Sequence, residues 1–128
     1  MSYTFTKTLD MPMDAAIEKV TEALAEAGFG ILTEIDVSTT LKQKIDVDFR
    51  PYRILGACNP KLAHQALEAE PNIGVMLPCN VIVQEYEPGV STVSAVDPVA
   101  SMSAIENEAL GRIANEVREM LQGVIASL

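Results

Sequence analysis

Short stretches in which polar and apolar residues alternate are the sequence feature that most constrains this fold. Successive side chains of a strand point to opposite faces of a sheet, so a period of two indicates a strand with one buried face. This pattern predicts five strands, over residues 2–9, 30–37, 52–58, 80–87 and 90–96. The dipeptide Pro88-Gly89 between the last two is a turn signal and predicts a hairpin.

Apolar residues at helical spacing follow the first strand. From Pro12, which suits the first position of a helix, apolar side chains recur every three or four residues until Gly28, which favours a helix end. After the second strand, Ser38 is expected to cap a short helical turn that runs to Lys44. The sequence therefore predicts one full helix and one short turn before residue 46.

Two further helices are predicted in the second half of the chain. Asn59 is a good N-cap and Pro60 a good first residue, so a short helix is expected from here to Pro71. Ser103 and Glu106 have the spacing of a capping box, which predicts the start of a long amphipathic helix. Its apolar positions are Ile105, Ala109, Ile113, Val117, Met120, Leu121, Val124 and Leu128.

The order of these elements indicates an α+β fold. A sheet that is mainly antiparallel, with helices on one face and a long helix at the C-terminus, accommodates the alternating strands. The chain has 128 residues, of which 48% are hydrophobic, and can bury a core without disulfides. We expect residues 1–128 to form a single domain.

Composition and charge exclude several classes of partner. The formal net charge is −9, which repels phosphate backbones and anionic lipid surfaces. Trp is absent and aromatic residues make up 5%, so surfaces for base stacking are not expected. We see neither a signal peptide nor an apolar stretch of membrane-spanning length. We therefore expect a cytoplasmic protein with reduced thiols that binds neither nucleic acid nor membranes.

Residues 51–83 contain the features that most resemble a functional site. This stretch holds both cysteines, each followed by an asparagine, and the only histidine, His64. We assign six candidate ligand-binding residues in and beside the two Cys-Asn corners: Cys58, Asn59, Cys79, Asn80, Arg53 and Lys61. Asn59 and Asn80 are also explained by simpler roles, as a helix cap and as a strand-end corner.

The two cysteines allow alternative interpretations. Cys58 precedes a helix N-terminus, where free N–H groups and the helix dipole favour an anion, but a small buried thiol is the commoner role of a free cysteine. If the third and fourth strands are antiparallel neighbours, Cys79 lies near Cys58. Such a pair could serve as a redox couple or bind a soft ion such as Cu(I) or zinc, with His64 or a dimer mate adding ligands.

Basic residues are concentrated in one part of an acidic chain. Five of the nine lie between residues 42 and 61, namely Lys42, Lys44, Arg50, Arg53 and Lys61. Together with the helix N-terminus at Asn59 they could bind a carboxylate or a phosphate, or they could simply pair with acidic neighbours. Glu34 and Asp36 share a strand face and could do acid–base chemistry, although such residues more often mark the solvated face of a sheet.

Five motifs together resemble the family known as domain of unknown function 302. They are GFGILTEIDV (28–37), LKQKI (41–45), PYRILGACNPKLAHQAL (51–67), IGVMLPCNVIV (73–83) and AVDP (95–98). The pairing of GACNP with LPCN is the most specific part. The resemblance implies a small α+β domain with a curved antiparallel sheet backed by helices, similar to the TATA-binding-protein-like fold, and a homodimer. It implies neither DNA binding nor an enzymatic activity.

Three functional hypotheses follow. We prefer a homodimeric module whose sheet and helices form an apolar pocket, with Cys58, Asn59, Cys79 and Asn80 at its rim and with the basic cluster selecting a small anionic ligand. The second hypothesis is a thiol redox, sulfur-handling or soft-metal protein that uses Cys58 and Cys79. The third is an interaction domain in which the cysteines only pack. No residue is assigned a catalytic role, and no metal or cofactor is assigned.

Overall fold

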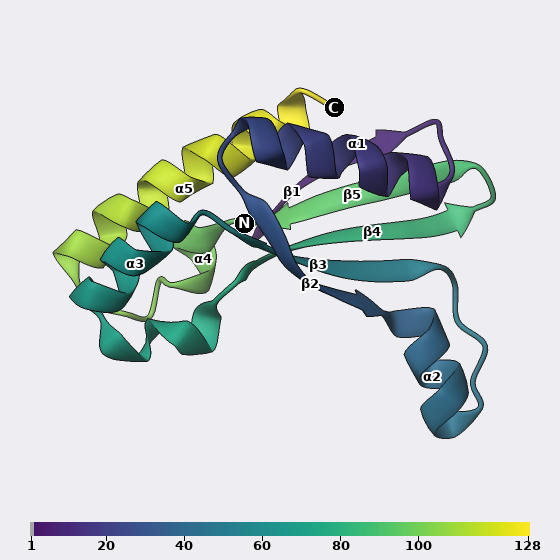
Figure 1. Ribbon diagram of the computed structural model, residues 1–128, viewed down its shortest axis with the longest axis horizontal. Coiled ribbons are helices and arrows are strands. Elements are labelled where there is room, and N and C mark those ends of the chain that lie inside the picture. Colours follow the sequence, from purple (N-terminus) through teal and green to yellow (C-terminus); the bar gives the residue numbers. More distant parts are fainter. Residues whose placement is uncertain (1) are drawn as a thin grey trace.

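Five strands form one antiparallel sheet, as the alternation predicts. The computed structural model describes residues 2–128. The strands are β1 (Thr4–Leu9), β2 (Gly30–Asp36), β3 (Tyr52–Cys58), β4 (Cys79–Glu87) and β5 (Val90–Val96). Their order across the sheet is β1-β5-β4-β3-β2, and each strand runs antiparallel to its neighbours (Figure 1).

Helices connect the strands and close the chain. They are α1 (Met13–Glu26), α2 (Val37–Ile45), α3 (Pro60–Ala69), the 3-10 helix η1 (Pro71–Met76), α4 (Pro98–Ser101) and α5 (Glu108–Ala126). The predicted α+β class and the long C-terminal helix are both confirmed. No helix within residues 2–128 is long and apolar enough to span a bilayer.

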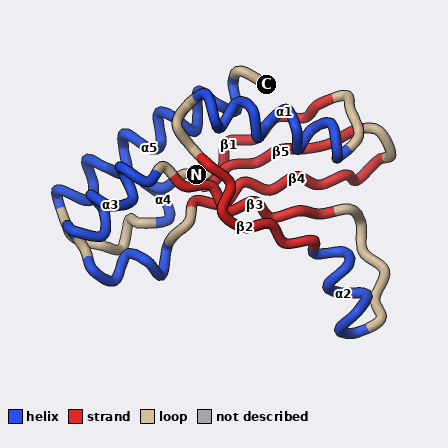
Figure 2. The backbone as a smooth tube through the Cα atoms, in the orientation of Figure 1, coloured by secondary structure: helices blue, strands red, loops and turns tan. Residues whose placement is uncertain are grey.

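One face of the sheet packs against α1 and α5 (Figure 2). The strand alternation puts a row of small and branched apolar residues on this face, and the apolar stripes of the two helices lie against it. Complete burial of each Val or Leu side chain stabilises the fold by about 1.5–3 kcal/mol. The central contacts involve Leu55, Val81, Val83, Val93 and Ala95 from the sheet, Val20 and Leu24 from α1, and Leu121 and Val124 from α5.

The opposite face of the sheet, which we call the open face, is left without a helical layer by the described residues. A row of residues in direct register crosses it from one edge to the other. The row consists of Ile35, Ile54, Ile82, Ser94 and Thr6. Its apolar half lies on β2, β3 and β4.

The N-terminal ends of two predicted helices differ from expectation by one or two residues. Pro12 is the residue before α1 and not its first helical residue. At α2 the cap is Asp36, whose carboxylate accepts a hydrogen bond from the Thr39 N–H at 3.0 Å. Ser38, the expected cap, instead donates its hydroxyl to Asp36. This bond to the Thr39 N–H is also the main cause that lowers the pKa of Asp36.

The expected capping box of the last helix is wrong. Ser103 donates to the carbonyl of Ala100, and α5 begins at Glu108 with Asn107 as its cap. The Asn107 side chain accepts from the Leu110 N–H at 3.1 Å and donates to the Ala69 carbonyl at 2.8 Å. The residues before it form the short helix α4, which the sequence pattern did not predict and which is capped by Asp97.

Two substitutions test whether Asn107 or Ser103 caps α5. Asn107→Ala removes a cap and the bond to Ala69, and should lower the free energy of unfolding by about 1–2 kcal/mol. Ser103→Ala removes one exposed hydrogen bond and should change it by less than about 0.5 kcal/mol. Urea denaturation of both variants measures the difference. Equal destabilisation by the two substitutions would contradict the assignment.

Candidate ligand-binding pocket

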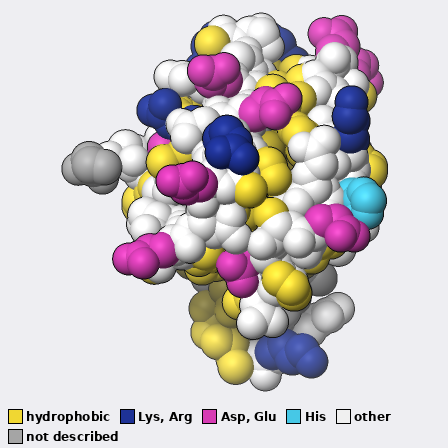
Figure 3. Space-filling view, turned by 90° about the vertical axis from the view of Figure 1, so that its left-hand side faces the viewer, with side chains coloured by type: hydrophobic (Ala, Val, Ile, Leu, Met, Phe, Trp, Pro, Cys, Tyr) yellow, Lys and Arg dark blue, Asp and Glu magenta, His cyan; other side chains and the backbone are white. Residues whose placement is uncertain are grey.

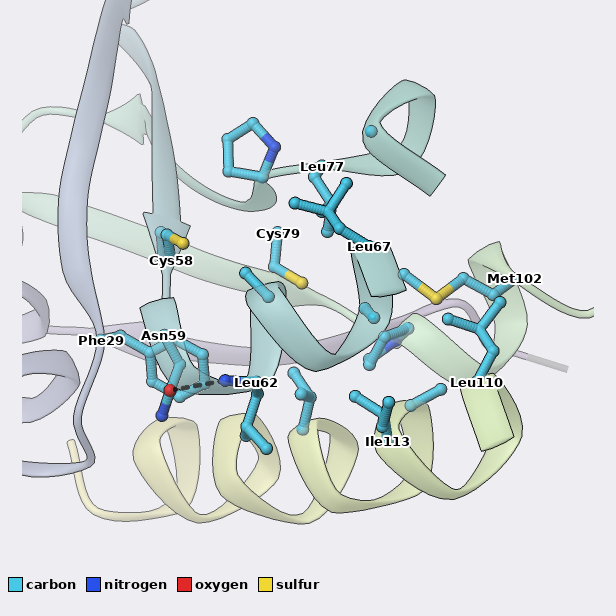
Figure 4. A pocket seen from close by; sticks show the side chains of 18 of the residues that line it. Phe29, Cys58, Asn59, Leu62, Leu67, Leu77, Cys79, Met102, Leu110 and Ile113 are labelled. Atoms are coloured by element: carbon cyan, nitrogen blue, oxygen red, sulfur yellow. Dashed lines mark hydrogen bonds between the residues drawn. The ribbon is translucent and has the colours of Figure 1, made fainter. Parts of the chain in front are cut away.

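An apolar cavity of about 310 Å³ lies beyond the ends of β3 and β4, between α3, η1 and α5. Figure 4 shows both cysteines on one side of this pocket, and Met102 and Leu110 on another. The lining consists of Phe29, Leu32, Ala57, Cys58, Asn59, Leu62, Ala63, Ala66, Leu67, Gly74, Leu77, Pro78, Cys79, Pro98, Met102, Leu110, Ile113, Ala114 and Val117. Apart from Asn59 and the two thiols, every side chain in it is apolar.

The pocket lies where two hydrophobic clusters meet. The larger cluster fills the space between the sheet, α1 and α5, and it contributes Ala57, Leu62 and Val117 to the lining. The smaller cluster joins α3, η1, α4 and α5, and it contributes Met102 and Leu110, among others. The cavity is therefore a gap at the junction of the two clusters, walled by side chains from both.

Asn59 sets the direction of α3, which forms one wall. Its side-chain oxygen accepts the Leu62 N–H at 3.2 Å, and Pro60 supplies a first residue that needs no hydrogen bond. Gly28 makes room for this corner. It has a φ of +93°, and a β-carbon there would lie 3.1 Å from the Asn59 side-chain nitrogen. The glycine is thus needed both for its backbone conformation and for its lack of a side chain.

Antiparallel pairing of β3 with β4 brings the two cysteines into one pocket. Ala57, the neighbour of Cys58, lies directly opposite Cys79 in the register. The third and fourth strands are therefore antiparallel neighbours, which was the condition for the two thiols to lie near each other. Both thiols line the same cavity. Neither is in a disulfide: Cys58 is a half-buried free thiol and Cys79 a buried one.

The Cys79 thiol is a neutral group at physiological pH. Burial, and secondarily the nearby Cys58, raises the pKa of Cys79 to about 11. A thiol must ionise to act as a nucleophile or to bind a metal ion strongly. Cys79 therefore behaves as part of the apolar lining more than as a reactive group.

The remaining sequence-assigned residues lie outside the lining. Asn80 is exposed and, as the next residue along β4, points to the face opposite Cys79. Lys61 is exposed near the start of α3. Arg53 is held on β3 by two carboxylates, with N–O distances of 2.7 Å to Glu34 and 3.2 Å to Asp36. The structure thus brings together Cys58, Asn59 and Cys79, and it does not bring Asn80, Lys61 or Arg53 into the pocket.

The basic cluster is largely occupied by local contacts. Lys42 lies 3.0 Å from Asp46 and 3.2 Å from Asp48. The Arg50 guanidinium lies over three aromatic rings, at 4.4 Å from the centroids of Phe49 and Tyr86 and at 5.6 Å from that of Tyr52. Lys42 and Arg53 are therefore paired with acidic neighbours, which is the alternative that the sequence left open.

The arrangement of possible metal ligands does not favour a metal centre. Within residues 2–128 no three His, Cys, Asp or Glu side chains gather closely enough to hold an ion. His64 is exposed on α3 and lies 3.4 Å from Glu68 one turn later. It does not line the cavity with the two thiols.

The sequence predicts an apolar pocket formed by the sheet and the helices, but it does not identify the apolar residues that line it. Leu110, Ile113, Ala114 and Val117 lie on one side of α5 and form a wall of the pocket. Their spacing is that of any helix stripe that packs on a core, so no local signal separates lining residues from core residues. The one available sign of irregular packing was the interrupted apolar periodicity around Met102, which lies between the predicted last strand and the predicted last helix.

These features define an α+β domain whose helices enclose a small apolar pocket beside two free thiols. The chain belongs to the family described as domain of unknown function DUF302, whose family model matches residues 5–128. It is similar to the crystal structure of an uncharacterized conserved DUF302 protein from Bacillus stearothermophilus, with 28% identity, 98% of each chain covered and a TM-score of 0.89. No curated protein matches this chain. The family resemblance carried by the sequence motifs is confirmed.

Gly56 allows Pro78 to pack closely over β3 just before Cys79. A β-carbon at Gly56 would lie 2.7 Å from the Pro78 ring and 2.2 Å from the Thr33 hydroxyl. Gly56→Ala should therefore force this corner apart and lower the free energy of unfolding by about 1–3 kcal/mol. Gly30→Ala is the matched control, because no atom of the described residues, 2–128, lies within 4 Å of a β-carbon there. Thermal denaturation of both variants tests this, and an unaffected Gly56→Ala protein would show that the corner adapts.

The raised pKa of Cys79 predicts a loss of stability at alkaline pH. The thiol has an ordinary pKa of 9.0 in the unfolded chain and about 11 in the fold. Between these values the folded protein keeps a proton that the unfolded chain releases. The Cys79 thiol therefore contributes fully to the free energy of unfolding below pH 9. About 2–3 kcal/mol of this free energy is lost as the pH rises through 11.

Urea denaturation at several pH values measures this loss. Cys79→Ala is the reference, because it lacks the thiol but keeps every other group that titrates in this range. The difference in unfolding free energy between the native protein and the variant should shrink from pH 8 to pH 11. A difference that stays constant over this range would mean that the Cys79 pKa is not raised.

Proposed function

We propose that this domain binds a small, uncharged and mainly apolar molecule in the pocket between α3, η1 and α5. The observation that carries this proposal is the lining itself, in which apolar side chains from both hydrophobic clusters surround an unfilled volume of about 310 Å³. Ligand sites in proteins are commonly concave, mainly apolar and of about 300–1,000 Å³, with a few polar groups that orient the ligand. This cavity lies at the small end of that range.

Three polar groups are available to orient such a ligand. The side-chain oxygen of Asn59 already accepts a backbone N–H, so its amide nitrogen remains as a donor. The Cys58 and Cys79 thiols are weak donors and acceptors. All three lie at the same end of the pocket, where β3 ends and β4 begins. A ligand would place its polar atom there and its apolar part along α5.

The charge of the lining argues for a neutral ligand and against the anionic one expected from the basic cluster. Among residues 2–128 no Lys or Arg lines the cavity. A carboxylate buried there would lose its hydration without an ion-pair partner, which costs several kcal/mol. Arg53 is already bound to Glu34 and Asp36, so it is not available to compensate.

The thiol hypothesis has weaker support, since Cys79 is protonated at neutral pH and the described residues gather no further metal ligand beside the pair. We also propose a cytoplasmic location, where both thiols remain reduced. For the fold, we propose a curved TATA-binding-protein-like sheet, which the helical layer on a single face supports.

A neutral fluorescent probe tests the proposed function. N-phenyl-1-naphthylamine should bind with saturation and increase its fluorescence in the pocket. Ala63→Phe places a ring in the lining and should weaken binding by at least about tenfold. Ala25→Phe, on an exposed position of α1, is the matched control and should leave binding unchanged. Equal binding by all three proteins would overturn the proposed site.

Competition between an alcohol and a carboxylate of the same length tests the choice of a neutral ligand. Octanol should displace the probe at a lower concentration than octanoate at pH 8. The opposite order, combined with a loss of octanoate binding in Lys61→Gln, would restore the anionic interpretation.

A further inference from the structure

A second cavity adjoins the pocket between α3, η1 and α5, which we call the first cavity. The second cavity has a volume of about 150 Å³ and is formed by α4, the start of α5 and the segment between them. Three residues, Met102, Leu110 and Ala114, line both cavities. Met102 and Leu110 lie on a different side of the first cavity from the two cysteines (Figure 4). The two cavities therefore share a wall away from the thiols.

The helical repeat of α5 explains how one helix borders both cavities. Leu110, Ala114 and Val117 lie on one side of the helix and line the first cavity. Gly111 and Asn115 each follow a shared residue by one position, which is a turn of about 100° around the helix axis, and they line the second cavity. The row formed by Leu110 and Ala114 is therefore the ridge that separates the two cavities.

This ridge is lowest at Ala114, because an alanine side chain ends at its β-carbon. Met102 belongs to the same hydrophobic cluster, is 9% exposed and borders both cavities. A methionine side chain is unbranched, has three rotatable bonds and adapts its shape to irregular spaces. Rotation of the Met102 side chain away from Ala114 joins the two cavities, so this residue is placed to act as a movable partition.

The course of the joined cavities favours a flexible ligand. It begins at the thiols, runs along the apolar side of α5 and then turns around the helix at Ala114. A rigid ring system cannot follow such a turn, whereas an alkyl chain can. Among residues 2–128, Phe29 is also the one aromatic side chain in either lining, so a flat ligand finds few rings on which to stack.

We propose that the ligand of this domain is an unbranched aliphatic molecule with one small neutral polar head, such as a long-chain alcohol, whose chain passes between Met102 and Ala114 into the second cavity. This inference rests on the proposed function, because it requires that the first cavity binds the ligand. The head lies at the thiol end, and the end of the chain contacts Val99 and Ile105. The Met102 side chain then determines which chain lengths bind.

Both cavities reach the surface, so a chain can enter. Leu67, which lines the first cavity, is 43% exposed. Figure 3 shows the end of the molecule formed by α3, α4 and the start of α5, where hydrophobic side chains reach the surface between polar and charged ones.

The polar rim of the second cavity tolerates an apolar chain. Ser103 and Asn115 are exposed there. The Ser103 hydroxyl already donates to the Ala100 carbonyl at 3.0 Å, and the Asn115 amide nitrogen donates to the Gly111 carbonyl at 2.9 Å. An alkyl chain that packs beside these groups therefore leaves both hydrogen bonds in place.

Displacement of N-phenyl-1-naphthylamine by 1-alkanols from hexanol to dodecanol tests the extended site. Each buried methylene should lower the dissociation constant by about fourfold, so the affinity of the native protein should rise through the whole series. Gly111→Leu should fill the second cavity, because no atom of residues 2–128 outside its own stretch of helix lies within 4 Å of a β-carbon there. Leucine is also the better helix former. This variant should bind hexanol like the native protein and dodecanol at least about tenfold more weakly.

Gly123→Leu is the matched control on the same helix. Gly123 is exposed and has the same free space at its β-carbon, but it lines neither cavity. This variant should bind every alcohol like the native protein. A branched isomer of dodecanol, 2-butyl-1-octanol, should bind the native protein at least about tenfold more weakly than dodecanol does, since a branched chain does not pass Ala114.

NMR of the isotope-labelled native protein locates the end of the chain without any substitution. The terminal methyl group of dodecanol should give intermolecular NOEs to methyl groups of Val99 or Ile105, and that of hexanol should not. Circular dichroism of each variant shows whether the fold is retained.

The results separate the extended site from the proposed function. Absence of the NOEs to Val99 and Ile105, or a Gly111→Leu protein that matches the native protein over the whole series, would overturn the extended site. So would equal affinity for dodecanol and its branched isomer. In each of these cases hexanol and octanol still bind, and the proposed function stands. A native protein that binds none of the alcohols would overturn both.

Discussion

The antiparallel pairing of β3 with β4 is the constraint on which the pocket depends. This register places Cys79 opposite Ala57, and so brings two thiols that are 21 residues apart to one end of the sheet. It also fixes where α3 leaves β3 and where η1 returns to β4, and these two segments form walls of the cavity. A slip of one residue would move Cys79 to the open face and Asn80 to the helical side. The exposed amide and the buried thiol show which register the core selects.

Neutrality is the main chemical property of this site. The protein as a whole is strongly acidic, and its sequence suggested a compensating basic site near residues 42–61. In the fold, Arg53 is bound by Glu34 and Asp36 of the neighbouring strand β2, and Lys42 of α2 is bound by Asp46 and Asp48 of the segment that follows this helix. The charges of Arg53 and Lys42 are therefore balanced locally, outside the pocket. The pocket is lined by apolar side chains, one amide and two free thiols, of which Cys79 is buried and protonated and Cys58 is half-buried.

Strands and helix starts were predictable because their signals are local. Period-two alternation identified all five strands, and Asn59 with Pro60 identified the start of α3. The same kind of signal failed at α5, where Ser103 and Glu106 have the right spacing but Asn107 is the cap, since its amide also reaches the Ala69 carbonyl from a distant helix. The pocket depends on such long-range contacts throughout. Leu110 and Val117 line a cavity or fill a core according to what lies opposite them, which no local pattern encodes.

The position of the cavity between two hydrophobic clusters links its occupancy to folding. A molecule held there touches residues of both clusters, such as Leu62 of the larger and Met102 of the smaller, and so replaces contacts that the empty gap lacks. A compound that binds the folded chain but not the unfolded chain raises the melting temperature. Once its concentration exceeds the dissociation constant, this rise increases with the logarithm of the concentration. If the proposed ligand binds in this pocket, its binding would therefore be detectable as a rise in the melting temperature. A thermal-shift screen of neutral metabolites would rank candidate ligands by affinity, whatever reaction or pathway they belong to.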